Sequence, residues 1–168
     1  MQNLNNNIFY FFYELGQQSA FVADFAILLS YLTYPILGAI FIWSVFFAKR
    51  KFLSFSILFL TTITTWLVAH TFKFLFQTVR PFVELGIKPL VFESGYAFPS
   101  EHTAVFFAVA FATLFLSKKV GRILLVLAIF IALSRIVLGV HYPGDILGGF
   151  ALGYFVSYLY IKLFKKLY

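Results

Sequence analysis

Five long apolar segments constrain the fold of this chain more than any other feature of its sequence. A transmembrane helix needs about 20 mostly apolar residues. Only 11% of the 168 residues are charged and 62% are hydrophobic, whereas a soluble domain would carry roughly a quarter charged residues. We therefore predict an all-α integral membrane bundle that forms a single domain over residues 1–168. Its five expected transmembrane helices cover roughly Phe21–Ala48, Phe52–Phe72, Thr103–Leu116, Ile123–Val140 and Ile146–Ile161.

Three further features complete the expected organisation. Ile8–Leu15 is rich in aromatic residues but too short to cross a bilayer, so we expect an N-terminal helix lying in the membrane interface. Pro35 is expected to kink the first transmembrane helix. The connection from Arg80 to Ser100 contains three prolines and two glycines, which favour an ordered loop over a helix.

Charge is distributed unevenly between the two ends of the expected bundle. Residues 49–51, 118–122 and 162–166 hold nine of the 13 basic residues and no acidic residue, and all six acidic residues fall at the other end. Basic loops of membrane proteins are typically cytoplasmic. We therefore expect a multi-pass protein with its N-terminus outside and its C-terminus in the cytoplasm. The net charge of +7 is then a topology signal, and no nucleic-acid partner is expected.

Polar residues gather in three short sequences that all map to the expected outer end. The first is KFLFQTVRP, residues 73–81, the second is FPSEHT, residues 98–103, and the third is SRIVLGVHYPGD, residues 134–145. Taken alone, each has an ordinary structural explanation: cations at a helix end that extend to the interface, a serine that begins a helix, and a histidine and an aspartate spaced four apart. Because three distant segments place such residues at one end, we predict a shared site.

The residue types in these sequences indicate phosphate chemistry. Arginine presents a planar fork that matches phosphate, and the free N–H groups at the start of a helix add further donors. Two histidines beside such donors suggest a nucleophile and a proton donor. An aspartate near one imidazole would fix its tautomer. The sequence thus favours phosphoryl transfer through a phosphohistidine, without a metal.

Two alternative chemistries would use the same residues. A serine hydrolase with Ser100 as nucleophile would leave the cationic side chains without a role. A metal site is disfavoured because those cations would repel a divalent ion and because no HExxH-like spacing is present. The residues available for such a metal site are Glu101, His102, His141 and Asp145.

The three sequences resemble the signatures KxxxxxxRP, PSGH and SRxxxxxHxxxD of the type 2 phosphatidic acid phosphatase (PAP2) superfamily. The second departs from the family pattern, because Glu101 stands where the family has glycine. The resemblance implies that His141 is the nucleophile, that Asp145 orients it and that His102 protonates the leaving oxygen. It also implies that no metal or other cofactor is needed. Lys73, Arg80, Ser100 and Arg135 would hold the phosphate, and Glu101 and Ser134 are candidates for a supporting role behind them.

An acidic residue at position 101 and the sequence RPF at residues 80–82 are similar to the bacterial undecaprenyl-diphosphate phosphatase branch. The resemblance implies a lipid phosphatase of the bacterial inner membrane with its site facing outward, acting on a lipid phosphate embedded in the bilayer. Undecaprenyl diphosphate is the expected substrate. Phosphatidylglycerophosphate, phosphatidate and lipid A phosphates are the alternatives, and a silent lipid-binding or transport protein is a further one. The Glu101 carboxylate is expected to point away from the phosphate or to pair with a neighbour such as Lys88.

Overall fold

The computed structural model describes residues 2–166, and these residues form a helical bundle closed at one end by a crossing helix. Within this described part of the chain, four helices are long and apolar enough to span a membrane, and a fifth apolar helix is shorter. A helix suits this solvent because it satisfies its own backbone hydrogen bonds in lipid. The helices in chain order are α1 (Gln2–Gln18), α2 (Ala20–Phe46), α3 (Lys51–Phe76), α4 (Pro81–Glu84), α5 (Glu101–Leu116), α6 (Lys118–Val137) and α7 (Pro143–Phe164).

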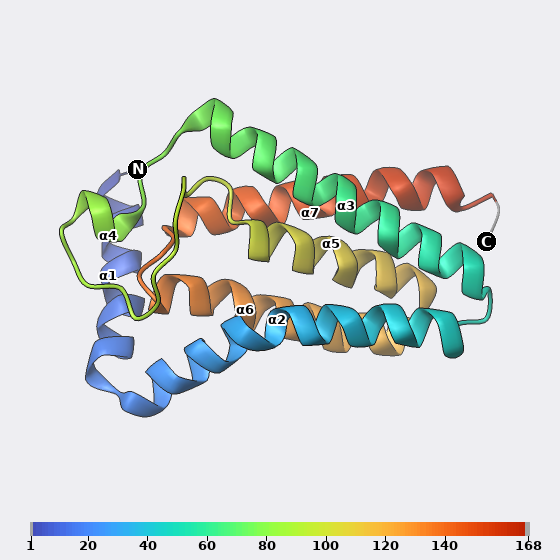
Figure 1. Ribbon diagram of the computed structural model, residues 1–168, viewed down its shortest axis with the longest axis horizontal. Helices are drawn as coiled ribbons and strands as arrows, with labels where there is room; N and C mark the ends of the chain where they lie inside the picture. The colour runs from blue at the N-terminus through green and yellow to red at the C-terminus, as the bar shows by residue number, and fades with distance from the viewer. Residues whose placement is uncertain (1, 167–168) are drawn as a thin grey trace.

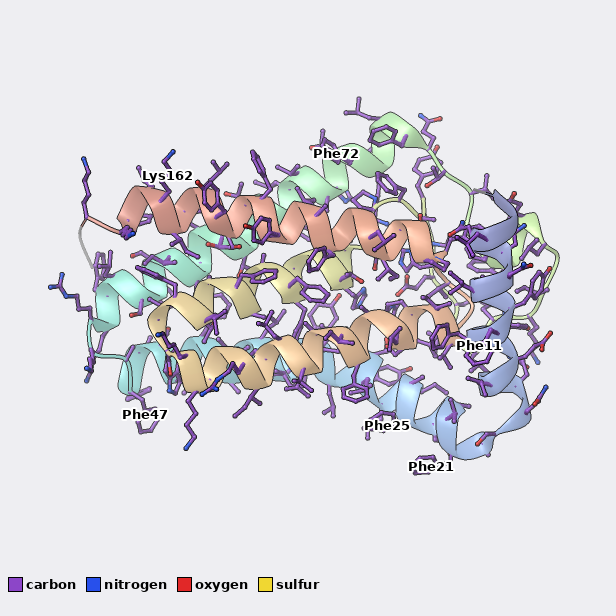
Figure 2. The ribbon with its side chains drawn as sticks, turned by 180° about the vertical axis from the view of Figure 1, so that it is seen from behind. Phe11, Phe21, Phe25, Phe47, Phe72 and Lys162 are labelled. Carbon is purple, nitrogen blue, oxygen red and sulfur yellow. The ribbon has the colours of Figure 1, made fainter. Side chains whose placement is uncertain are left out.

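Large apolar side chains cover the outside of the bundle. Figure 2 shows Phe21, Phe25, Phe47 and Phe72 pointing outward from the helices, and their positions match a lipid-facing surface. The exposed surface of a soluble protein rarely carries apolar patches of this extent. The chain is therefore a multi-pass membrane protein, as its composition predicts.

Helix α5 occupies the centre of the bundle, which explains how a short helix can belong to it. It has 16 residues, or about 24 Å at 1.5 Å per residue, which is less than a bilayer core. Its side chains are mostly buried, and they form the main core together with residues of α2, α3 and α6. Because neighbouring helices rather than lipid surround it, α5 does not have to match the thickness of the membrane.

Two glycines bring α7 unusually close to α5. A Cβ atom at Gly149 would lie 2.7 Å from the Ser100 carbonyl oxygen, and one at Gly153 would lie 2.4 Å from that of Ala104. Small residues allow such close backbone contact between membrane helices. The backbone N–H of Ser100 donates to the Asp145 carbonyl at 3.1 Å and joins the starts of the two helices. This packing sets the second and third polar sequences side by side.

The observed elements match the expected ones closely, with two differences. The N-terminal helix is longer than Ile8–Leu15 and lies across the end of the bundle, as Figure 1 shows. The connection after α3 is not entirely loop, because Pro81 begins the one-turn helix α4. Helix α2 contains Pro35 and bends along its length in Figure 1. The basic turns after α2 and α5 and the end of α7 lie at the end of the bundle away from α1.

Candidate active site

All seven predicted site residues lie at the α1 end of the bundle. Lys73 is in the last turn of α3, Arg80 precedes α4, and Ser100 and His102 begin α5. Arg135 is in the last turn of α6, His141 lies between α6 and α7, and Asp145 is in the first turn of α7. Six of the seven side chains are buried, and His102 is half-buried. The structure therefore brings the three polar sequences together as predicted.

The His141 imidazole lies between Asp145 and Arg80. Its Nδ1 atom is 3.4 Å from Oδ2 of Asp145, and its Nε2 atom is 3.3 Å from Nη1 of Arg80. A guanidinium group can only donate, so a hydrogen bond at this contact requires the tautomer in which Nε2 accepts and Nδ1 carries the proton toward Asp145. Burial, followed by the charges of Arg80 and Arg135, lowers the pKa of His141 well below 6.5. The imidazole is therefore neutral at neutral pH.

Asp145 lies in the first turn of α7, and a hydrogen bond to the backbone holds its side chain in place. Its Oδ2 atom accepts a hydrogen bond from the backbone N–H of Tyr142 at 2.8 Å, which forms part of a capping box at the start of α7. Gly139, with φ of 78°, allows the tight turn after α6 that leads to this start. The turn and the cap together hold His141 against Asp145.

Arg80 is held mainly by backbone carbonyls. It donates from Nε to Gly95 at 3.0 Å, from Nη2 to Ser94 at 3.2 Å, and from Nη1 to Val140 at 3.1 Å. Nη1 also donates to Oε2 of Glu93 at 2.8 Å. These carbonyls fix the guanidinium in one orientation whatever occupies the pocket beside it.

Arg135 is fully buried, and a carboxylate balances its charge. Its Nη1 atom donates to Oγ of Ser30 at 2.6 Å, and its Nη2 atom is hydrogen-bonded to Oε1 of Glu93. Burial raises the pKa of Glu93, but attraction to Arg135, His102 and Arg80 outweighs burial, so the net pKa lies below the ordinary 4.5. Glu93 is the site residue that the sequence analysis missed. It lies in a loop without a motif. The one feature of the sequence that could have pointed to it is its position between Arg80 and Ser100, two predicted phosphate ligands.

Ser100 and Lys73 complete the set of donors. The Ser100 hydroxyl accepts a hydrogen bond from Thr103 at 3.0 Å, which leaves its own proton available to a ligand. Lys73 donates from Nζ to the carbonyls of Tyr96 at 2.6 Å and Ala97 at 3.4 Å. Lys73 thereby ties the end of α3 to the loop that precedes α5.

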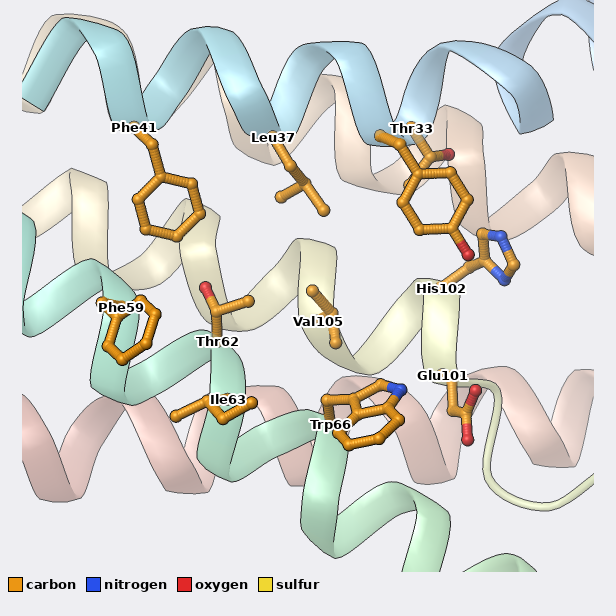
Figure 3. Close-up of a pocket in the computed structure, with 11 residues that line it drawn as sticks. Thr33, Leu37, Phe41, Phe59, Thr62, Ile63, Trp66, Glu101, His102 and Val105 are labelled. Carbon is orange, nitrogen blue, oxygen red and sulfur yellow. The ribbon is translucent and has the colours of Figure 1, made fainter.

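Two pockets meet at Glu101 and His102. The polar pocket, of about 300 Å³, is lined by Lys73, Arg80, Phe92, Glu93, Ser94, Glu101, His102 and His141. The apolar pocket, of about 310 Å³, lies between α2, α3 and α5. Figure 3 shows Glu101 and His102 at one end of the apolar pocket and Phe41 and Phe59 at the other. An amphipathic ligand could therefore place a charged group in one pocket and an apolar chain in the other.

Among the described residues, neither Glu101 nor Ser134 bonds a predicted phosphate ligand. Glu101 pairs with His70 rather than with Lys88, because its Oε1 atom lies 3.3 Å from Nδ1 of His70. His70 stacks on Trp66; the sequence analysis did not single it out, although it lies three residues before Lys73 on the same helix. The Ser134 hydroxyl donates to the Ile131 carbonyl of its own helix at 2.7 Å.

Comparison with known proteins identifies the family. A family model described as the PAP2 superfamily matches residues 52–168. YbjG of Escherichia coli, named as a candidate undecaprenyl-diphosphatase, is 31% identical over 160 residues, which cover 91% of this chain and 79% of YbjG. BcrC of Bacillus licheniformis, named as a bacitracin transport permease protein, is 30% identical over 154 residues, which cover 89% of this chain and 75% of BcrC.

A solved structure shares the fold. The crystal structure of a transmembrane PAP2-type phosphatidylglycerolphosphate phosphatase from Bacillus subtilis superposes with a TM-score of 0.74 at 26% identity. The match covers 99% of this chain and 87% of that protein. The chain therefore belongs to the PAP2 superfamily and is a membrane phosphatase of that superfamily.

Proposed function

We propose that this chain removes the terminal phosphate of a membrane lipid, with undecaprenyl diphosphate as substrate and undecaprenyl phosphate and inorganic phosphate as products. One observation carries the proposal: the polar pocket, lined by Lys73, Arg80 and two imidazoles, meets an apolar pocket between helices at Glu101 and His102. The terminal phosphate would occupy the polar pocket, and part of the lipid chain would occupy the apolar one. The name of YbjG supports the choice of substrate.

The first chemical step is attack by His141. The lone pair of Nε2 faces the polar pocket, because Nδ1 faces Asp145. Nε2 forms a bond to the terminal phosphorus while the bond from phosphorus to the bridging oxygen breaks. Arg80, Arg135, Lys73 and the Ser100 hydroxyl stabilise the charge on the phosphoryl oxygens, and Asp145 stabilises the imidazolium that forms.

His102 handles the protons of both steps. Its Nδ1 atom faces the polar pocket, 4.0 Å from Oε1 of Glu93. Protonated in the substrate complex, where the negative charge of the phosphate favours the imidazolium, it gives its proton to the bridging oxygen as the lipid leaves. It then takes a proton from water, whose oxygen attacks phosphorus as the bond to His141 breaks. Inorganic phosphate leaves, and His141 regains its lone pair.

Phosphate release from purified protein tests this proposal. The protein in detergent with EDTA would be supplied with undecaprenyl diphosphate, phosphatidylglycerophosphate or phosphatidate, and His141→Ala would serve as the blank. We expect release with EDTA present, fastest from undecaprenyl diphosphate, and none in the blank. Preference for phosphatidylglycerophosphate, the lipid in the name of the structural neighbour, would reassign the substrate. No release from any lipid would favour a silent binding or transport protein.

We also propose that the protein lies in the bacterial inner membrane with the polar pocket facing outward and the C-terminus in the cytoplasm. The charge distribution supports this orientation. The chain has no cysteine, so a single cysteine can be introduced at exposed Lys88 or exposed Lys165. A membrane-impermeant maleimide should label Lys88→Cys in intact cells and Lys165→Cys only after permeabilisation. The reverse pattern would contradict the orientation.

A further inference from the structure

The Glu93 carboxylate lies at the centre of the polar pocket. It bonds Arg80 through Oε2 and Arg135 through Oε1. Its Oε2 atom is 3.8 Å from Nε2 of His141, and its Oε1 atom is 4.0 Å from Nδ1 of His102. The carboxylate thus touches both guanidinium groups and lies between both imidazoles.

A phosphate on which His141 acts would have to lie in the same place. It would need Arg80 and Arg135 on its oxygens, Nε2 of His141 in line with phosphorus and His102 beside the leaving oxygen. Carboxylate and phosphate both pair with guanidinium forks. The two anions therefore compete for the same donors and cannot occupy them together.

The carboxylate fills this place incompletely. Within residues 2–166, the fully buried Nε atom of Arg135 has no hydrogen-bond partner. The Ser100 hydroxyl accepts from Thr103 but has no acceptor for its own proton among the bonds recorded for the described residues. An unpaired buried donor is costly. A carboxylate has two oxygens, whereas a terminal phosphoryl group has three that are free to accept, so a phosphate group could accept from more donors than the carboxylate does.

The Glu93 side chain can leave while Arg80 stays in place. It is 20% exposed and belongs to the loop between α4 and α5. Arg80 keeps its bonds to the carbonyls of Ser94, Gly95 and Val140 when the carboxylate moves away. Rotation of one side chain is therefore enough to open the place for phosphate.

We propose that Glu93 is an internal competitor for the phosphate position. It neutralises Arg80 and Arg135 in the substrate-free protein, is displaced by the terminal phosphate of the substrate, and returns to help expel inorganic phosphate. That the ligand which displaces Glu93 is a lipid phosphate rests on the proposed function. Only the fraction of the protein in which Glu93 is displaced can bind phosphate. The apparent affinity for every phosphate ligand is therefore lowered by the same factor.

Calorimetric titration with inorganic phosphate tests this competition without turnover. Glu93→Gln should bind inorganic phosphate on the order of tenfold more tightly than the wild type. Its melting temperature should be lower than that of the wild type in phosphate-free buffer and should rise more when phosphate is added. Glu84→Gln is the matched control, since Glu84 lies on α4 outside the polar pocket and bonds the Tyr142 hydroxyl. We expect its phosphate affinity to match the wild type.

Kinetics with lipid provide the second measurement. The KM for lipid and the inhibition constant for inorganic phosphate should fall by the same factor in Glu93→Gln. Unchanged or weaker phosphate binding in this variant would overturn the proposal, even if the wild type hydrolyses lipid normally. Tighter phosphate binding in a protein that hydrolyses no lipid would sustain the competition and reject the proposed function instead.

A shorter carboxylate provides a variant that keeps the charge of the loop. Glu93→Asp withdraws the carboxylate by one methylene and so weakens its contact with Arg135. If Glu93→Gln cannot be purified folded, Glu93→Asp should still bind phosphate more tightly than the wild type, by a smaller factor. Equal or weaker binding by Glu93→Asp would count against internal competition.

Discussion

The polar pocket and the apolar pocket have similar volumes and share Glu101 and His102, but their construction differs. In the polar pocket, hydrogen bonds and ion pairs fix the positions of the side chains. Arg80 alone donates to three backbone carbonyls and a carboxylate. The surface of the apolar pocket is mainly carbon atoms, contributed by side chains such as Leu37, Ile63 and Val105. Single substitutions should therefore be severe in the polar pocket and mild in the apolar one.

His141→Ala should have the largest effect. Removing the nucleophile eliminates the covalent step, so phosphate release should fall by about 10³-fold or more. His70→Ala is a matched control, because it removes an imidazole that lies outside the polar pocket. Both rates would be measured with undecaprenyl diphosphate. Substantial activity in His141→Ala, or an equal loss in His70→Ala, would show that the polar pocket does not depend on this residue.

Arg135→Lys should reduce kcat/KM by roughly 10²-fold. An ammonium group cannot contact Ser30 and phosphate in the forked arrangement that the buried guanidinium provides. Arg122→Lys makes the same change at an exposed position in the basic half of α6, and its kcat/KM should remain that of the wild type. Equal activity of the two variants would mean that the positive charge at position 135 is sufficient and that the forked geometry of the guanidinium group is not needed.

Trp66→Ala should change the apolar pocket mildly. Loss of part of the apolar lining should raise the KM for a long-chain lipid by roughly 3- to 10-fold, as expected for about 1 kcal/mol of lost contact. Hydrolysis of a water-soluble phosphate monoester should not change. Leu67→Ala, next to it on α3 but outside the pocket, is the control. An equal effect on both substrates would mean that Trp66 acts on the polar pocket instead.

Glu93 gives the polar pocket a pH-dependent contribution to stability. Its folded pKa lies below the ordinary 4.5, so the contribution is complete above pH 4.5 and is lost as the pH falls through the folded pKa. In phosphate-free buffer the wild type should melt a few degrees above Glu93→Gln at neutral pH, and the two melting curves should converge below pH 4.5. A difference that stays constant with pH would show that the charge of Glu93 does not contribute.

The fold was predictable because hydropathy and helix geometry dominate it. The apolar lengths located the ends of the five expected transmembrane helices to within five residues. The orientation of α1 across the bundle depends on tertiary contacts, such as the Tyr13 hydroxyl donating to the Lys88 carbonyl at 2.8 Å. Such contacts between distant segments leave no periodic pattern in the sequence.

The position of a site residue was predictable only where it belongs to a motif with fixed sequence spacing. The spacing from His141 to Asp145 places both at the start of one helix, and the motif residues converge as expected. The pairing of Glu101 with His70 depends on how α3 packs against α5, and the position of Glu93 depends on the path of a loop that turns at Gly95, where φ is 77°. Sequence spacing does not specify either arrangement.

The stereochemical course at phosphorus distinguishes a phosphohistidine intermediate on His141 from direct attack on the lipid phosphate. Undecaprenyl diphosphate would be made chiral at its terminal phosphorus with the three stable isotopes of oxygen, and the configuration of a product transferred to an acceptor alcohol would be determined. Attack by His141 followed by attack on the phosphohistidine inverts the phosphorus twice, so the account predicts overall retention of configuration. Inversion would mean that the acceptor attacks the lipid phosphate directly, and His141 could then not be the nucleophile.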